Sequence, residues 1–283
     1  MATIPQPMPF SDYQAIQAIN ATAIKAGRVS MRHMRAVMTG ERKDETPATR
    51  WGKIVHLAVL EPDEMPRKLA VYDGRKAGKD WDAFKADHES QYIVSPDEQA
   101  ALVKMSNSVH SKPLAHRLID TSYHEVTFTW RDAMLGDCKA RLDGVVLPEV
   151  ASVPAVVLDL KTTSMIEARR FGQQFAGLGY GLQFGWYAHA VEVSYSVPVD
   201  CYVIALESRE PYDCVVYKVA RETVRAGYDE AVEIAKFYRA CGSIKLWPGV
   251  DQGHDFLPLE LPAWATGGAE VDVSDGAMSA EDL

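Results

Sequence analysis

The sequence has few of the features that mark membrane or secreted proteins. No run of 18 or more apolar residues occurs in its 283 residues, so no membrane-spanning helix is predicted. Residues 1–7 have neither the basic residues nor the apolar stretch of a secretory signal. Cysteine is scarce too: the four present are widely spaced, without a Cys-x-x-Cys pair, which predicts reduced, mostly buried thiols. We therefore expect a cytoplasmic protein with no membrane partner.

Net positive charge, which is common in nucleic-acid-binding proteins, is also lacking. The formal net charge is −9, and part of it comes from the end of the chain. After Gly268 there are five acidic residues and no Lys or Arg, among many small residues. We expect residues 266–283 to form a disordered acidic tail.

The charge balance reverses near the start of the chain. Between Lys25 and Lys53, eight basic residues accompany three acidic ones. This stretch is either a solvated surface or an arm that binds phosphate, and composition does not separate the two interpretations. In the second interpretation, the candidate DNA-binding residues are Arg28, Arg32 and Arg35.

The apolar pattern changes from helical to strand-like along the chain. Helices are expected over 9–21, 30–38, 48–60 and 96–109, with a short one from Pro113 and a polar, irregular stretch at 63–92. Strands are expected at 124–130, 137–147 and 156–161, then a helical segment at 165–193 that breaks near 177–181, strands at 200–207 and 212–219, and a helix at 221–240. This order predicts an α/β (α+β) fold with a central mixed sheet flanked by helices. We expect a single domain over residues 1–265, with a helical arm at 9–62 and a core at about 96–240.

The stretch from Arg141 to Lys161 carries the strongest functional signal. Asp159 and Lys161 follow the apolar run 156–158, and side chains two apart on a strand share a face. Charged groups at the end of a core strand are costly unless a metal, a substrate or each other compensates them. The bland interpretation is a surface salt bridge between the two. Asp143, in an Arg-x-Asp-Gly sequence on the preceding strand, favours a functional site instead.

Asp143 and Asp159 suit the hydrolysis of a phosphodiester. That reaction needs a deprotonated water, neutralised charge on phosphorus and a stabilised leaving oxygen, which two divalent ions about 4 Å apart supply together. Mg²⁺ prefers oxygen ligands, and carboxylates on adjacent strands converge naturally. We therefore expect Mg²⁺ as the cofactor, with Mn²⁺ as a substitute. Lys161 can orient the attacking water and lower its pKa.

The spacing of these residues resembles the PD-(D/E)xK nuclease superfamily, with its αβββαβ core. More narrowly, the chain resembles the exodeoxyribonuclease VIII (RecE-type) exonucleases over most of residues 10–240. The segments that carry this resemblance are Gly52–Pro62, Glu125, Cys138–Asp143, Asp159–Thr163, Gln183–Tyr187 and Glu207–Tyr212. One departure is Ser30-Met31, where family members often have Ser-Pro.

The resemblance implies roles for residues that are ambiguous by themselves. His56 is otherwise a core or surface histidine, and Glu125 a solvent-facing strand residue. Gln183 and Tyr187 share a helix face at i, i+4, a spacing that an ordinary amphipathic helix also shows. The implied metal ligands are His56, Glu125, Asp143, Asp159 and the carbonyl of Leu160. The implied catalytic residues are Asp143, Asp159, Lys161, Gln183 and Tyr187.

The resemblance also implies an activity: Mg²⁺-dependent 5′ to 3′ degradation of linear double-stranded DNA that leaves 3′ overhangs for homologous recombination. It implies a bacterial or phage-encoded protein, a homo-oligomeric ring and a single-strand annealing recombinase as partner. A structure-specific or single-strand nuclease with the same chemistry is an alternative. A DNA-binding module on a decayed nuclease fold is another, although intact Asp143, Asp159, Lys161 and Gln183 argue against it.

Overall fold

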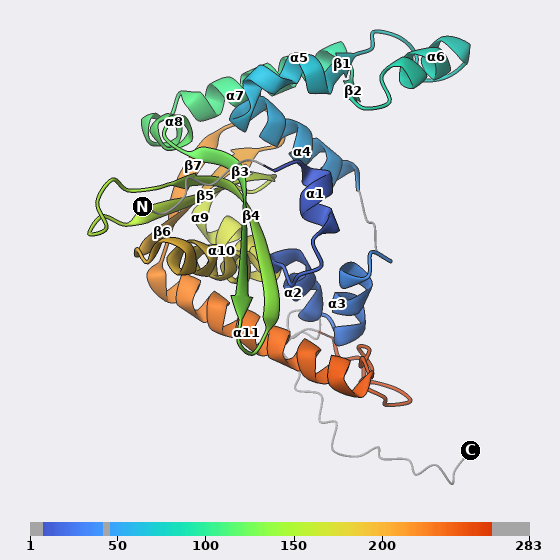
Figure 1. Ribbon diagram of the computed structural model, residues 1–283. Helices are drawn as coiled ribbons and strands as arrows, with labels where there is room; N and C mark the ends of the chain where they lie inside the picture. Colours follow the sequence, from blue (N-terminus) through green and yellow to red (C-terminus); the bar gives the residue numbers. More distant parts are fainter. Residues whose placement is uncertain (1–7, 42–45, 262–283) are drawn as a thin grey trace.

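The computed structural model describes residues 8–41 and 46–261. A five-stranded mixed sheet forms its centre, with helices on both faces (Figure 1). The strands, in their spatial order, are β3 (Tyr123–Asp132), β4 (Gly136–Val146), β5 (Ala155–Thr163), β6 (Val199–Glu207) and β7 (Cys214–Val219). β5 and β6 run parallel, and the other neighbours are antiparallel. The predicted fold class and the order of three strands, helix and strand are therefore confirmed.

The helices follow the sequence expectations closely outside two regions. They are α1 (Phe10–Ala15), α2 (Ala21–Gly27), α3 (Met31–Met38), α4 (Pro47–Leu60), α5 (Met65–Lys68), α6 (Lys79–Asp87), α7 (Pro96–His110), α8 (Pro113–Asp120), α9 (Ala168–Gly177), α10 (Tyr180–Tyr195) and α11 (Arg221–Ile244). The Ser30 hydroxyl caps α3 by accepting the His33 N–H, as its position before the helix predicts. No helix in the described ranges is both long and apolar enough to span a membrane.

The sheet separates two apolar clusters. The first contains Val157 and Val203, and α2, α10 and α11 pack on this face. The second contains Leu158 and Leu160, and α4, α7 and α8 cover it (Figure 1). Because side chains alternate along β5, Asp159 and Lys161 share the face of the first cluster, as predicted. All four cysteines are buried and free, which confirms the prediction for them.

The prediction of one helix over 9–21 is wrong, because tertiary contacts break it. α1 ends at Ala15, and Ile19 forms a parallel bridge to Cys138 at the edge of the sheet. The buried ammonium of Lys139 donates hydrogen bonds to the carbonyls of Tyr13 and Ile16, both at 2.7 Å. A buried ammonium needs such acceptors, and the last carbonyls of a helix supply them.

The prediction of an irregular stretch at 63–92 is also wrong. It contains the 3₁₀ turn Pro62–Glu64, the helices α5 and α6, and the strands β1 (Leu69–Val71) and β2 (Tyr92–Val94). The two short strands pair in parallel, and Val94 is buried in the second cluster. Their backbone bonds to each other and their burial outweigh the polar composition around them. The predicted tail, 266–283, lies outside the described residues.

Glycines set the position of α10 against α11. A Cβ on Gly227 would lie 2.1 Å from the carbonyl oxygen of Gly181, and one on Gly185 would lie 2.3 Å from the Tyr228 nitrogen. Both separations are far below van der Waals contact, so the backbones meet where only glycine fits. This contact positions α10, which carries Gln183 and Tyr187, over the sheet.

Candidate active site

The structure brings the two predicted aspartates together in the centre of the sheet. Gly144 of β4 pairs with Leu158 of β5 in an antiparallel register, so Asp143, one residue before Gly144, lies beside Asp159, one residue after Leu158. Asp143 Oδ2 accepts the backbone N–H of Leu160 at 2.9 Å, and Asp159 is fully buried. Burial first, and the nearby Asp159 carboxylate second, raise the pKa of Asp143 to about 7. Two neighbouring, largely buried carboxylates favour the binding of a cation.

Lys161 supplies the only cation in direct contact with this pair among the described residues. Its ammonium forms an ion pair with Asp159 Oδ2, and it lies 5.1 Å from the centre of the Tyr180 ring. Burial by itself would lower the pKa of Lys161, but the carboxylates of Asp159 and Asp143 raise it above its usual range. Lys161 is therefore charged at neutral pH.

Gln183 of α10 continues this network. Its Nε2 donates to Asp159 Oδ1 at 2.7 Å and lies 3.2 Å from the Tyr187 hydroxyl oxygen. Its Oε1 accepts a hydrogen bond of 2.8 Å from the ammonium of Lys25. Because the amide oxygen faces Lys25, the amide NH₂ must face Asp159, so Lys25 determines the orientation of the Gln183 amide.

His56 reaches the same place from α4. Its Nε2 lies 2.8 Å from the carbonyl oxygen of Leu160, and its Nδ1 lies 3.5 Å from Asp143 Oδ2. Burial, with the charge of Lys161 adding to it, lowers the pKa of His56, so the ring is neutral at pH 7. A neutral ring that donates from Nε2 to Leu160 leaves the Nδ1 lone pair directed at the carboxylates.

Glu125 lies across from Asp143 on β3, in an unusual backbone conformation. The register pairs His124 with Gly144 and Val126 with Leu142, and Glu125 between them has φ of 52°. This left-handed conformation costs a non-glycine residue of the order of 1 kcal/mol or more, and such strain is typical of functional sites. The Glu125 carboxylate accepts a 2.8 Å hydrogen bond from Arg141. Burial, and then Asp143, raise the pKa of Glu125.

The donor set fits a hard divalent cation. One ligand atom from each of His56, Glu125 and Asp143 lies within 4.8 Å of the others. Asp159 Oδ2 is buried, and among the described residues its partner is the ammonium of Lys161. The Leu160 carbonyl retains one lone pair beside His56. Carboxylate and carbonyl oxygens with one imidazole suit Mg²⁺ or Mn²⁺.

The three predicted DNA-binding arginines lie away from this cluster. Arg28 Nε pairs with Glu230 of α11 at 2.9 Å, and its Nη1 donates to the Ala176 carbonyl at 3.0 Å. The guanidinium of Arg35 lies 4.1 Å from the centre of the Trp247 ring. Arg32 contacts the same segment, where its backbone N–H donates to Pro248. Arg28 is thus already neutralised, while Arg32 and Arg35 remain exposed.

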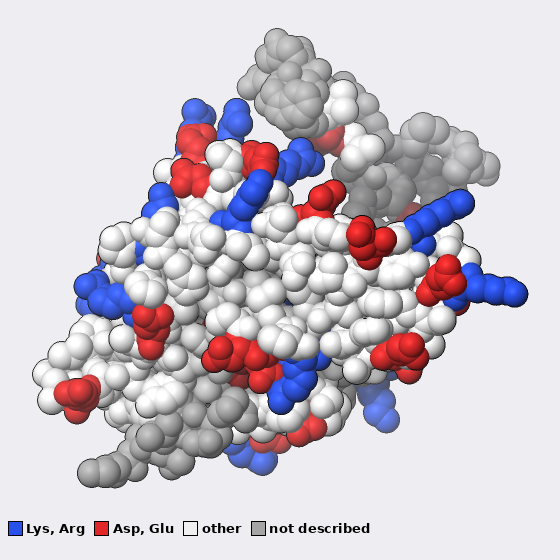
Figure 2. Space-filling model, turned by 90° about the horizontal axis from the view of Figure 1, so that it is seen from above, with Lys and Arg blue, Asp and Glu red and all other residues white. Residues whose placement is uncertain are grey.

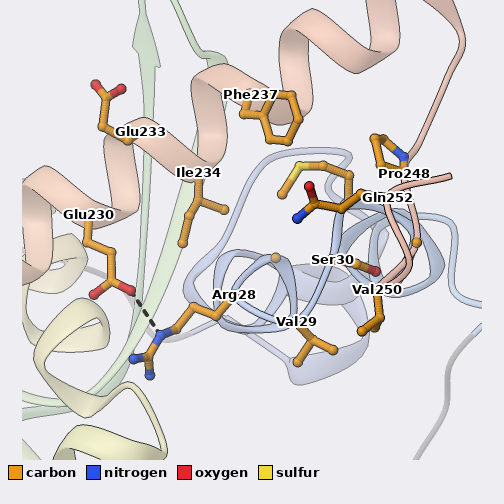
Figure 3. A pocket seen from close by; sticks show the side chains of 13 residues that line it. Arg28, Val29, Ser30, Glu230, Glu233, Ile234, Phe237, Pro248, Val250 and Gln252 are labelled. Carbon is orange, nitrogen blue, oxygen red and sulfur yellow. Dashed lines mark ion pairs between the residues drawn. The ribbon is translucent and has the colours of Figure 1, made fainter. Parts of the chain in front are cut away.

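Arg28 also borders a hollow of about 800 Å³ between the α2–α3 corner, α11 and residues 248–252 (Figure 3). Its walls carry Val29 and Phe237, with Glu230 and Glu233 from α11, and none of the predicted catalytic residues lines it. On the face drawn in Figure 2, acidic and basic side chains are interspersed around a largely uncharged centre. Neither surface has the single-sign basic character typical of a DNA-binding face.

Lys25 is the site residue that sequence reasoning missed. It belongs to the basic stretch at 25–53, yet nothing in its spacing links it to Gln183, which is 158 residues away. Burial first, and the charge of Lys161 second, lower the pKa of Lys25 to about 8. Within the described residues Lys25 forms no ion pair, and the partners of its charge are neutral: the Gln183 amide and the Tyr180 ring, whose centre lies 5.6 Å away.

Mixed-sheet topology, an Asp on each of two adjacent strands and a Lys two residues after the second Asp together define a PD-(D/E)xK fold and site. A family model described as a PDDEXK-like domain of unknown function (DUF3799) matches residues 20–254, and the chain belongs to that family.

Solved structures agree with this assignment at the level of the fold. A protein of Eubacterium rectale described as a "putative exonuclease" superposes with a TM-score of 0.60 at 11% identity, over 94% of this chain and 100% of that chain. A phage-related exonuclease of Haemophilus somnus 129PT matches at a TM-score of 0.33 and 9% identity, over 83% of this chain and 100% of that one, which is too distant to carry an argument. No curated protein matches the chain.

Proposed function

We propose that this protein is a metal-dependent exodeoxyribonuclease that degrades linear double-stranded DNA from 5′ to 3′ and leaves 3′ overhangs. The observation that carries the nuclease part is the convergence of Asp143, Asp159 and Lys161 on one face of the sheet, with Gln183 bonded to Asp159. The direction and the duplex preference rest on the resemblance of the site segments to exodeoxyribonuclease VIII (RecE-type) enzymes.

Each residue of the site has a distinct role in the proposed hydrolysis of a phosphodiester. His56, Glu125, Asp143, Asp159 and the Leu160 carbonyl would hold Mg²⁺, and two bound ions would supply the Lewis-acid stabilisation of the reacting phosphate. Lys161 is charged and paired with Asp159, so it can hold the attacking water by donating a hydrogen bond to it. Gln183 fixes Asp159 Oδ1, and Tyr187 lies against the Gln183 amide.

Lys25 has spare donors for the substrate. An ammonium has three N–H donors, and one of them is committed to Gln183. An ammonium that is removed from water and is not paired with a carboxylate has lost favourable charge interactions. A bound anion restores them. In the proposed enzyme, Lys25 therefore holds an oxygen of the DNA phosphate while it keeps Gln183 in place.

The acidity of the chain fits an enzyme that holds its substrate by shape. A homo-oligomeric ring around the duplex would retain DNA topologically, and would explain a net charge of −9 in a nuclease. A single-strand annealing recombinase would then receive the 3′ overhang. The ring and the recombinase partner are both proposed from the family resemblance.

The decisive experiment compares four DNA substrates: linear duplexes labelled at the 5′ or at the 3′ end, a covalently closed circular duplex, and a single strand. Purified protein with Mg²⁺ should release mononucleotides first from 5′ labels and leave the circle intact. Asp159→Asn is the matched control for a contaminating nuclease. Cutting of the circle or a preference for single strands would reject the exonuclease and favour the alternative nuclease, and no cutting by a folded protein would favour the DNA-binding module.

A further inference from the structure

A second group of metal-ligand side chains lies where α7 meets α8. His110 is the last residue of α7, and His116 and Asp120 stand one turn apart on α8. One ligand atom from each lies within 4.8 Å of the others. These two helices pack on the sheet face of Leu158 and Leu160, which is opposite to the face of Asp159 and Lys161. The group shares no residue with the candidate active site.

Two imidazole nitrogens in this group point at each other. His110 Nδ1 lies 3.2 Å from His116 Nδ1, and the rings meet edge-on at 82°. With a metal ion at the usual Zn–N distance of about 2.0–2.1 Å from both nitrogens, the N–metal–N angle would be about 100–106°. That angle is close to tetrahedral, so the two nitrogens already have the separation of ligands on one ion.

Asp120 selects the form of His116 that binds a metal. Its Oδ2 lies 3.3 Å from His116 Nε2. A proton on Nε2 is favoured by this carboxylate, and in the neutral ring the Nδ1 lone pair is then free and faces His110. A carboxylate behind a ligating histidine is the usual second partner at metal sites, where it fixes the tautomer and raises the basicity of the ring.

We propose that His110 and His116 bind a first-row transition-metal ion such as Zn²⁺ through their Nδ1 atoms, with Asp120 orienting His116. Two nitrogen ligands favour such ions over Mg²⁺, which prefers oxygen. The side chains of His116 and Asp120 are each 54% exposed, so the remaining coordination positions are open to water. The bound ion would join the end of α7 to α8 and stabilise the corner between them.

The alternative is that the nitrogens share a proton, as donor and acceptor of one hydrogen bond. The two cases differ in their response to zinc. Binding of Zn²⁺ is measured by calorimetry at pH 7.5 with excess Mg²⁺, in an Asp143→Asn background that weakens the other cluster of histidine and carboxylates. His254→Gln is the control, because His254 is exposed and outside both groups.

We expect one zinc ion to bind the background protein and the His254→Gln control equally. His110→Gln and His116→Gln should each weaken binding more than about 100-fold, and Asp120→Asn about 10-fold, as is typical of an outer partner. Replacement of zinc by Co²⁺ should give the visible absorption of a tetrahedral ion, which the His116→Gln variant lacks. Zinc affinity unchanged by His116→Gln, with circular dichroism showing intact folds, would overturn the site and leave only the hydrogen bond.

Discussion

Two groups of histidine and carboxylate side chains, built from the same residue types, lie in contrasting surroundings. The first is His56, Glu125 and Asp143, and the second is His110, His116 and Asp120. The first lies among strands, where burial raises the pKa of Asp143 to about 7 and lowers that of His56. The second lies on the surface of a helix corner, where solvent screens each charge.

The numbers of imidazole and carboxylate ligands, together with the surrounding charges, distinguish which ion each group suits. In the first group, Asp159 and the Leu160 carbonyl add oxygen donors, and two lysines add positive charge where a phosphate would enter. In the second group nitrogen predominates, and the ammonium of the adjacent Lys112 is paired with Asp213 at 3.1 Å. The first group therefore suits a hard cation such as Mg²⁺, and the second suits a transition-metal ion.

The largest expected effect is on the rate of DNA cleavage, and among the two groups only substitutions in the first should produce it. Asp143→Asn or Asp159→Asn should lower kcat by at least about 10³-fold, because several kcal/mol of charge stabilisation is lost with each carboxylate. His116→Gln should cleave DNA at the wild-type rate. EDTA should abolish activity, Mg²⁺ or Mn²⁺ should restore it, and Ca²⁺ should support binding alone. Near-normal cleavage by either Asn variant would show that the assignment of the site is wrong.

Lys161→Ala should lower kcat by about 10² to 10⁴-fold, the range typical of a residue that assists proton transfer. Its affinity for Ca²⁺, measured by calorimetry, should remain close to wild type, because Lys161 acts on the water and not as a metal ligand. An equal loss of metal affinity would make Lys161 a structural partner of Asp159.

Lys25→Met should lower kcat/KM by about 10 to 100-fold, since a hydrogen bond to a charged group contributes about 1.5–3 kcal/mol. Lys25→Arg should recover part of the loss, because the charge is kept while the geometry changes. Single-turnover rates on a 5′-labelled duplex provide the measurement. Unchanged kinetics of Lys25→Met would show that Lys25 has no role in the reaction, even though it is hydrogen-bonded to Gln183.

The pH dependence of metal binding should distinguish the buried group. Because the pKa of Asp143 is raised to about 7, folding favours its protonated form, and its contribution to stability is lost as pH rises from about 4 through about 7 in the metal-free protein. A cation must displace that proton, so Ca²⁺ affinity should fall by about tenfold per pH unit below pH 7 and level off above it. Calorimetry from pH 5.5 to 8.5 tests this, and a flat profile for the wild type would contradict the assignment. Asp143→Asn should abolish the dependence.

The smallest effect concerns the exposed arginines of α3. If Arg32 and Arg35 hold DNA phosphates, Arg32→Gln and Arg35→Gln should each reduce the log–log salt slope of binding by about one unit. Arg35→Gln should also cost about 0.5–1 kcal/mol of stability, because its guanidinium lies over Trp247. Unchanged affinity and slope for 5′-phosphorylated ends would leave this surface without a role in DNA entry.

Local sequence patterns predicted the strands of the core and the two aspartates of the candidate site. Apolar residues alternate at 124–130 and form a continuous run at 156–158, and both patterns are typical of strands. The two-residue period of a strand then places Asp159 and Lys161 on one face. Prolines and Ser30 mark the starts of α3, α4 and α7 for equally local reasons, since caps and fixed φ angles act within one turn.

Which distant groups complete the candidate site depends on how the segments pack together. Lys25 meets Gln183 because α2 packs against α10, and the break in the predicted helix at 9–21 follows from the acceptors that buried Lys139 requires. The left-handed backbone of Glu125 is held by its neighbours on β4. Local sequence cannot encode these features, because their energies come from contacts and desolvation between segments that meet only after the chain has folded.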